Sequence, residues 1–214
     1  RTPLTSIRES VIILKDHYRE NLSDDQLSLL EITLRNINRL GKLVQDILDF
    51  QKLDAVLMNF NFKTENINDL INLLLKDLKG YTNTTSIEIK TDLHENLPDV
   101  KIDKERISQV LINLINNAIK FTKKGTITVK TEPGGENNLT KVSVIDTGTG
   151  IRPQDIAKIF VPFYQIKEKT EQKSCGTGLG LSISNKILES HKTKLQVISK
   201  FGCGSTFYFY LSVN

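Results

Sequence analysis

The stretch that begins near Asp24 constrains the fold most, because it carries more apolar surface than one partner helix can cover. One stripe, with Gly41 at its gap, consists of Leu27, Leu30, Leu34, Ile37, Val44 and Leu48. A second stripe consists of Leu40, Leu43, Ile47 and Phe50. At about 1.5 Å per residue, a helix that carries both stripes reaches about 45 Å, and a lone hairpin of that length cannot cover both. We therefore expect two copies of the chain to form a dimeric four-helix bundle; packing on the chain's own downstream half is the alternative.

A shorter amphipathic helix comes before this stretch. Its apolar positions are Leu4, Ile7, Val11, Leu14 and Tyr18. In one interpretation, Thr2 is the N-cap and Pro3 the first helical residue; in the other, the helix continues upstream. Ser23 and Gln26 have the spacing of a capping box, which predicts that the second helix starts near Asp24. Residues 1–58 are therefore predicted to be a helical hairpin domain.

The pattern changes to mixed elements over residues 59–214, which we assign to a second domain. We predict strands at 60–63, 86–93, 126–132, 141–147, 194–200 and 205–213, helices at 67–78, near Gln154 and at 179–190, and a short strand running into a long helix within 100–122. Helices and mostly antiparallel strands in this order indicate a two-layer α/β sandwich, so the whole chain is of the α+β class.

Composition narrows the class of protein. The 214 residues, 38% of them hydrophobic and 25% charged, have room for two domains with separate cores. Apolar runs are only a few residues long, so we expect any membrane anchor to lie outside these residues. The net charge of +4 comes from scattered lysines, which argues against a nucleic-acid partner. Cys175 and Cys203 match no metal-ligand spacing and suit a reducing compartment, with a disulfide or redox switch left open.

Three motifs in the second domain carry polar groups suited to a nucleotide. In NLINNAIKFT, Asn113 and Asn117 share one helix face, and Lys120 follows one turn later. Amide oxygens suit Mg²⁺ and an ammonium suits phosphate, although a solvent-facing stripe is the ordinary alternative. In VSVIDTGTGI, Asp146 ends an apolar strand before Gly148 and Gly150. Such an acceptor suits an adenine amino group, and a simple turn is the alternative.

The third motif, CGTGLGLSIS, opens a helix with Gly176, Gly178 and Gly180. Free N–H groups at a helix start favour phosphate. A Rossmann fingerprint or a plain loop would have the same glycines. A Rossmann fingerprint, however, follows the first strand of a βαβ unit, whereas this motif follows the charged stretch KEKTEQKSC.

Together and in this order, the motifs resemble the catalytic module of sensor histidine kinases, within the GHKL ATPase superfamily. NLINNAIKFT resembles the N box, DTGTGI the G1 box, IFVPFYQ the F box, GTGLGLSI the G2 box and GCGSTFYFYL the last glycine motif. The resemblance implies a sandwich of the GHKL (Bergerat) type that binds ATP and Mg²⁺. Its implied nucleotide-binding residues are Asn113, Asn117, Lys120, Phe121, Asp146, Gly148, Gly150, Ile151, Gly176, Thr177, Gly178, Leu179, Gly180 and Thr206.

Individual roles follow from the same resemblance. Asn117 is similar to the Mg²⁺ ligand, and Asn113 and Lys120 to its phosphate-contacting neighbours. Asp146 would accept a hydrogen bond from the adenine amino group, and Phe121 and Ile151 would line the adenine slot. Residues 161–177 resemble the ATP lid, with Phe160 and Phe163 as a hydrophobic hinge and Lys167, Lys169 or Lys173 near phosphate. Cys175 departs from the family's usual glycine.

RTPLTSI resembles the downstream half of the H box. The phospho-accepting histidine is then expected three residues before Arg1, with the helix continuing upstream and Pro3 as a bend within it. Thr2 would occupy the position of a residue that orients water for dephosphorylating the regulator; a helix-surface threonine is the alternative. His17, His94 and His191 are expected to be surface or capping residues.

The resemblance implies a cytoplasmic, homodimeric autokinase that passes its phosphoryl group to the receiver domain of a response regulator, and that also acts as a phosphatase for it. Two other functions stay open. One is a GHKL ATPase without phosphotransfer, against which the helical hairpin argues. The other is a non-catalytic dimerisation scaffold, against which the intact N, G1 and G2 motifs argue.

Overall fold

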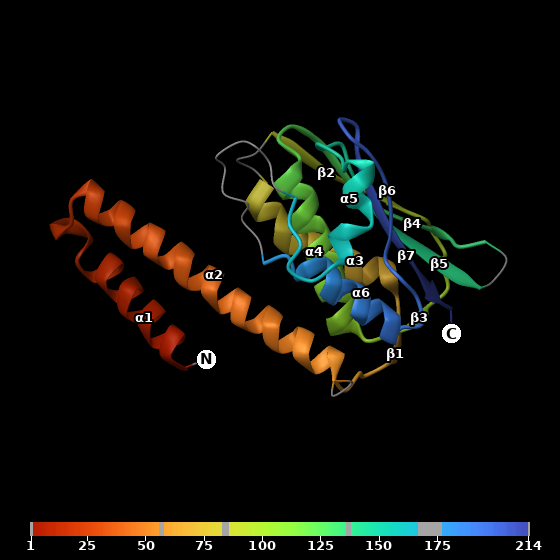
Figure 1. Ribbon diagram of the computed structural model, residues 1–214, viewed down its shortest axis with the longest axis horizontal. Helices are drawn as coiled ribbons and strands as arrows, with labels where there is room; N and C mark the ends of the chain where they lie inside the picture. Colours follow the sequence, from red (N-terminus) through yellow and green to blue (C-terminus); the bar gives the residue numbers. More distant parts are fainter. Residues whose placement is uncertain (1, 56–57, 83–85, 136–137, 167–176, 214) are drawn as a thin grey trace. The chain divides into compact units, whose positions relative to one another are not determined.

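The computed structural model describes residues 2–55, 58–82, 86–135, 138–166 and 177–213. It divides the chain into two compact units, Arg1–Gln51 and Lys52–Asn214 (Figure 1). This division falls inside the last turns of the long second helix, a few residues before the predicted domain boundary. No helix among the described residues is both long and apolar enough to cross a membrane.

The first unit contains the predicted helical hairpin. Helix α1 (Thr2–His17) is followed by a short 3₁₀ helix, η1 (Arg19–Asn21), and by the long helix α2 (Asp24–Asp54). The capping box is confirmed: the Ser23 backbone N–H donates to Gln26 Oε1 at 2.9 Å, and the Gln26 N–H donates to Ser23 Oγ at 3.3 Å. Thr2 and Pro3 both belong to α1.

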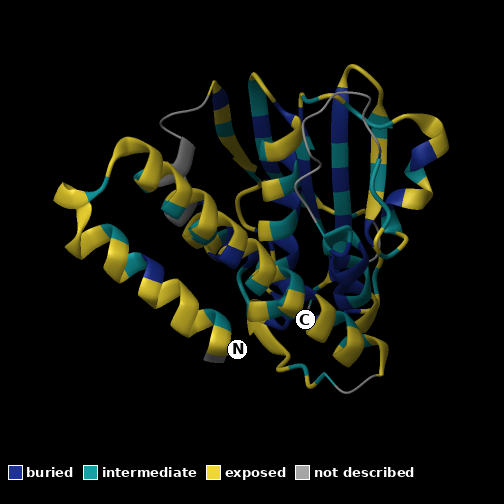
Figure 2. Cartoon of the chain, turned by 60° about the vertical axis from the view of Figure 1, so that its left-hand side comes forward, coloured by how far each residue is buried: buried dark blue, intermediate teal, exposed yellow. Residues whose placement is uncertain are grey.

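Much of the apolar surface of the hairpin is exposed in the single chain, and Figure 2 shows the two helices mostly in yellow. Val11 and Ile37 are buried. Exposed large apolar side chains are Ile7, Ile13, Leu14, Tyr18, Leu29, Ile32, Leu40, Val44, Ile47 and Leu48. Members of both predicted stripes of α2 are among them, so each stripe still has apolar area that another surface could cover.

The second unit is an α/β sandwich. Among the described residues its main sheet has five strands, in the order β2 (Ile87–Leu93), β4 (Gly125–Pro133), β5 (Leu139–Asp146), β7 (Gly204–Ser212) and β6 (Gln196–Lys200). Strands β2 and β4 are parallel and the other neighbours antiparallel. Strands β1 (Lys63–Glu65) and β3 (Val100–Ile102) form a separate antiparallel pair.

Three helices cover one face of the sheet: α3 (Ile67–Thr82), α4 (Lys104–Phe121) and α6 (Gly180–Ser190) (Figure 1). Alternation along the strands fixes which side chains face them. Ile127 and Val129 of β4 are fully buried, and Thr131 Oγ1 donates to Asn68 Oδ1 of α3. Their partners in β5 are Asp146, Val144 and Val142, which therefore share the helix face.

The prediction of a strand at 60–63 is wrong for its first three residues, because β1 begins at Lys63. The pattern of residues 60–63 suggests a short strand. The two rings instead stack on each other, with centroids 5.8 Å apart, and the Asn61 N–H donates to a carboxylate, Asp103 Oδ2, at 2.8 Å. The other predicted strands are present with small shifts at their ends, as are the predicted helices.

Candidate functional site

Asp146, the last residue of β5, provides a buried acceptor at the edge of the sheet. The residue is 7% exposed, and its Oδ1 accepts the Gly148 N–H at 2.8 Å. Burial raises the pKa of this carboxyl, while backbone N–H groups of Gly148 and Ser205 lower it. The carboxylate is therefore desolvated and held in place by the backbone.

The turn after Asp146 is held against the end of α4. The Thr149 N–H donates to the Phe121 carbonyl oxygen at 3.1 Å. Gly148 is needed for this approach, because a Cβ there would meet the Phe121 carbonyl oxygen and lie 2.8 Å from Asp146 Oδ1. The carboxylate and the C-terminal end of α4 are thus parts of one site. Beyond the turn, Gly150 has a positive φ, and the Ile151 N–H donates to Ser199 Oγ at 2.8 Å.

The structure corrects the expected place of Thr206. Its strand partners are Ile145 and Ile198, so Thr206 lies on the face of the sheet opposite the helices. Ser205 instead pairs with Asp146, is 7% exposed and supplies the N–H that lowers the Asp146 pKa. Its alternation with the apolar residues Phe207 and Phe209 is the sequence signal that could have identified it.

Asn113 and Asn117, on one side of α4, have different surroundings. Asn113 Nδ2 donates to Ser184 Oγ of α6 at 2.9 Å, and Ser184 is 1% exposed. Gly180 permits this contact, because a Cβ there would meet Asn113 Oδ1 and lie 3.0 Å from Cγ. Asn113 therefore joins the two helices, and Ser184 is a site-lining residue that the sequence motifs did not single out.

Asn117 lies one turn further along α4 and is half-buried. In the described parts of the chain, no hydrogen bond engages its amide. Lys120 follows, with Nζ 4.8 Å from the ring centroid of Phe121, which is 45% exposed. A partly open amide oxygen beside an ammonium and an exposed ring fits a divalent ion, an anion and a flat group next to one another.

The glycine motif leads into the first turn of α6. Thr177 Oγ1 accepts the Leu179 N–H at 3.1 Å, and the Gly178 carbonyl oxygen accepts the Phe163 N–H at 2.9 Å. Leu179 is fully buried, so none of its atoms is exposed for a ligand to contact. Helix α6 then begins at Gly180 and presents N–H groups that suit an anion. Gly176 lies outside the described residues.

The described start of the predicted lid, residues 161–166, is attached at its base. Tyr164 Oη donates to Asp155 Oδ1 at 2.7 Å, and Asp155 is 7% exposed in the short helix α5 (Pro153–Ile156). Phe160 ends the 3₁₀ helix η2 (Lys158–Phe160) and is half-buried, but Phe163 is 61% exposed. Lys167, Lys169, Lys173 and Cys175, and the Thr2 side chain, lie outside the described residues.

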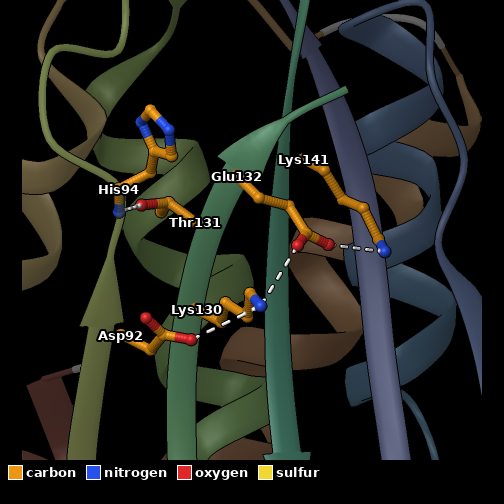
Figure 3. Close-up of polar contacts among 6 residues, drawn as sticks. All are labelled: Asp92, His94, Lys130, Thr131, Glu132 and Lys141. Carbon is orange, nitrogen blue, oxygen red and sulfur yellow. Dashed lines mark hydrogen bonds and ion pairs between the residues drawn. The ribbon is translucent and has the colours of Figure 1, made fainter. Parts of the chain in front are cut away.

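A row of charged side chains crosses the opposite, open face of the sheet and is separate from this site (Figure 3). Lys130 Nζ lies 3.4 Å from Asp92 Oδ2 and 3.2 Å from Glu132 Oε2, and Glu132 Oε1 lies 2.8 Å from Lys141 Nζ. Hydrogen bonding by the two lysines holds the pKa of Glu132 below its usual value. These partly exposed pairs balance charge locally along the strands.

The three histidines agree with the expectation of surface or capping residues. His17 and His94 are exposed, and Figure 3 shows the His94 ring extending beside β2 while its backbone N–H donates to Thr131 Oγ1 at 3.1 Å. His191 is the C-cap of α6 and is also buried, with 7% exposure.

Both units contain residues that match known protein-family models. Residues 102–214 match the model described as histidine kinase-, DNA gyrase B- and HSP90-like ATPase, and residues 1–56 match the His Kinase A (phospho-acceptor) domain.

Individual relatives agree over the whole chain. The sensor histidine kinase WalK of Bacillus subtilis is 32% identical over 99% of this chain and 34% of its own length. Full-length ShkA, solved in complex with AMPPNP, is 26% identical with a TM-score of 0.82 over 100% of this chain and 44% of that chain. Histidine kinase ThkA, solved with response regulator TrrA, is 25% identical with a TM-score of 0.71 over 100% of this chain and 60% of that chain. The chain spans less than half of the length of each of these curated relatives, from 11% to 43%.

Proposed function

This chain belongs to the family of histidine kinase-, DNA gyrase B- and HSP90-like ATPases and carries a His Kinase A phospho-acceptor domain, and we propose that it is the core of a homodimeric sensor histidine kinase. In this proposal it binds ATP, promotes phosphorylation of a histidine upstream of Arg1 and delivers the phosphoryl group to an aspartate on a response-regulator receiver domain. This core would lie in the cytoplasm, where ATP is available. Any membrane anchor would lie in segments outside these residues.

The observation that carries the proposal is the position of the desolvated Asp146 carboxylate. Backbone N–H groups hold it at the end of β5, and the adjoining turn contacts the C-terminal end of α4. It can accept a hydrogen bond from the amino group of adenine, and Phe121 and Ile151 can flank the base. Selection for adenine over guanine follows, because guanine presents a carbonyl oxygen at that position, and two acceptors cannot share a hydrogen bond.

The polyphosphate would lie between α4 and the start of α6. Lys120 would neutralise phosphate charge, and the first N–H groups of α6 would donate to phosphate oxygens. The half-buried amide oxygen of Asn117 fits Mg²⁺, which would neutralise charge on the phosphates when bound. These residues would position the γ-phosphate and neutralise its charge. The imidazole of the upstream histidine would then attack the γ-phosphorus as the bond to ADP breaks. A water-orienting role for Thr2 in dephosphorylating the regulator stays a prediction.

The test is to incubate the full-length protein with ATP labelled at the γ-phosphate and to divide the product between acid and alkali. We expect protein-bound label that survives alkali and is lost in acid, as phosphohistidine does. Bound nucleotide without protein-bound label would point instead to an ATPase or a scaffold.

Asp146→Asn tests the nucleotide half of the proposal. Its added amide N–H₂ would face the adenine amino group donor to donor, so we expect at least a tenfold loss of ATP affinity, about 1.4 kcal/mol or more. Asp92→Asn, on the open face of the sheet, is the matched control. Calorimetric titration with an ATP analogue measures both, and equal affinities in the two variants would overturn the assignment of Asp146.

A further inference from the structure

His191 is buried with both ring nitrogens engaged. Nδ1 lies 2.8 Å from the Ile187 carbonyl oxygen, and Nε2 lies 3.0 Å from the backbone N–H of Asp103. A carbonyl can only accept and a backbone N–H can only donate. The ring is therefore neutral, with its proton on Nδ1 and a lone pair on Nε2.

Asp103 extends this contact to the segment that joins α2 to β1. Its carboxylate caps α4, because Oδ1 accepts the Arg106 N–H at 3.1 Å. The second oxygen accepts the Asn61 N–H at 2.8 Å, and the residue is 6% exposed. One aspartate thus bonds to His191 through its backbone and to the connecting segment through its side chain.

Aromatic packing holds the same segment from another side. The ring centroids of Phe60 and Phe62 lie 5.7 Å and 4.9 Å from that of His191, in edge-on arrangements. Residues 58–62, here called the connector, are therefore held by two aromatic contacts and one partly buried hydrogen bond. All three fixing points meet at Asp103 and His191.

The helices joined at this point are the two that carry the candidate site. Asp103 caps the start of α4, which leads to Asn113 and Asn117, and His191 ends α6, which begins at Gly180. We propose that Asp103 and His191 form a latch that fastens the connector to both helices, and that His191 is thereby a positioning residue for phosphoryl transfer. The transfer part of this inference rests on the proposed kinase function, whereas the latch itself does not.

The latch should affect the rate of phosphoryl transfer rather than the binding of nucleotide. The connector lies in the chain between the hairpin and the site that would bind ATP. A loose connector reduces the time that the reacting groups spend aligned, without removing any nucleotide contact. Opening the latch should therefore lower the rate at saturating ATP and leave nucleotide affinity unchanged.

Protonation of His191 should open the latch, because a proton on Nε2 would face the Asp103 N–H. Burial lowers the pKa of His191, and the Ile187 carbonyl and the Asp103 charge oppose this. Asp103, the N-cap of α4, is the charged group beside the ring, whereas α6 contributes a carbonyl and the connector contributes two phenyl rings. The pKa of His191 is lower in the folded protein than in the unfolded chain. The contribution of the neutral ring to folding stability is therefore complete above the unfolded pKa of 6.5 and is lost as pH falls below it.

Two substitutions separate the two hydrogen bonds of the ring. His191→Asn keeps an N–H near Nδ1 but has no acceptor at the Nε2 position, whereas His191→Gln can place an amide oxygen near Nε2. In the full-length protein we expect His191→Asn to speed amide exchange at Asn61 and Asp103. It should also slow phosphohistidine formation about tenfold at saturating ATP, the cost of leaving one buried donor, the Asp103 N–H, without its acceptor. The dissociation constant for an ATP analogue should stay within about twofold in both variants.

His191→Gln should retain most of the rate and should remove the decline of rate below pH 6.5 that we expect of the unsubstituted protein. Phe62→Ala is a second way to open the latch and is mild, because this side chain is 39% exposed. Leu73→Ala, at a 52% exposed side chain in α3, is its control.

An unchanged rate and unchanged amide exchange in both His191→Asn and Phe62→Ala would overturn the latch. Parallel loss of affinity and rate would overturn the positioning role and indicate general damage to the fold. If the unsubstituted protein forms no phosphohistidine, the kinase proposal fails, while amide exchange still decides whether the latch exists.

Discussion

Asp146 illustrates, at the scale of one residue, how a binding group can lower the stability of the empty protein. Burial raises its pKa above the ordinary value of 3.8. The folded chain then keeps this proton to higher pH than the unfolded chain does. The stabilisation of the folded state by this proton is complete below the pKa of Asp146 in the unfolded chain and is lost as pH rises through its pKa in the folded chain. At neutral pH the ionised carboxylate is desolvated without a ligand to compensate.

We predict a pH-dependent difference between the protein and its Asp146→Asn variant in the absence of nucleotide. As pH rises from about 4 to 7, the free energy of unfolding should shift in favour of the variant, because asparagine has no charge to desolvate. Urea unfolding at several pH values measures this shift, with Asp92→Asn as the exposed control. A difference that does not change with pH would mean that Asp146 carries no such penalty.

At the scale of elements, the α4–α6 contact depends on one small residue. Gly180 starts α6 where a Cβ would meet the Asn113 amide, and that amide donates to Ser184. Helix propensity favours alanine over glycine, but the loss of this partly buried hydrogen bond costs more than the gain in propensity.

Gly180→Ala should therefore destabilise the second unit by about 1–2 kcal/mol and weaken nucleotide binding about tenfold or more. Gly41→Ala in α2 is the matched control, because nothing lies within 4 Å of its added Cβ. That change lies in the hairpin rather than in the second unit and should leave nucleotide affinity unaltered. Thermal unfolding and calorimetric titration measure both effects, and a harmless Gly180→Ala would show that the Asn113–Ser184 contact is dispensable.

At the scale of the whole molecule, the hairpin exposes apolar side chains that the proposed dimer would bury. Leu48, at 44% exposure, belongs to the first stripe of α2 and Ile47, at 41%, to the second. Burying a leucine contributes about 1.5–3 kcal/mol, which corresponds to one to two orders of magnitude in association.

Leu48→Glu should weaken dimerisation by at least tenfold, because the dimer would then have to bury a charge in place of a leucine. Leu73→Glu, at 52% exposure in α3, should leave association unchanged. Sedimentation velocity over a range of concentrations separates the two. Monomers in the unsubstituted protein, or equal association of both variants, would contradict the four-helix bundle.

Much of the local architecture could be predicted from the chain, because it depends on neighbours in sequence. The capping box at Ser23 needs residues three apart, and the apolar periods that predicted α2 and α4 need only one helix face. The order of the N, G1 and G2 motifs likewise identified the family before any contact was known. Asp146 at a strand end followed from the same local signals.

What could not be predicted depends on contacts between distant segments. Packing put Ser205 rather than Thr206 beside Asp146, because the register between β5 and β7 decides which side chain faces the helices. Packing also turned Asn113 toward Ser184 and buried His191 between Asp103, Phe60 and Phe62. Periodicity says that a residue lies on a face, but burial and hydrogen-bond partners depend on which segments meet there, and those segments lie far apart along this chain.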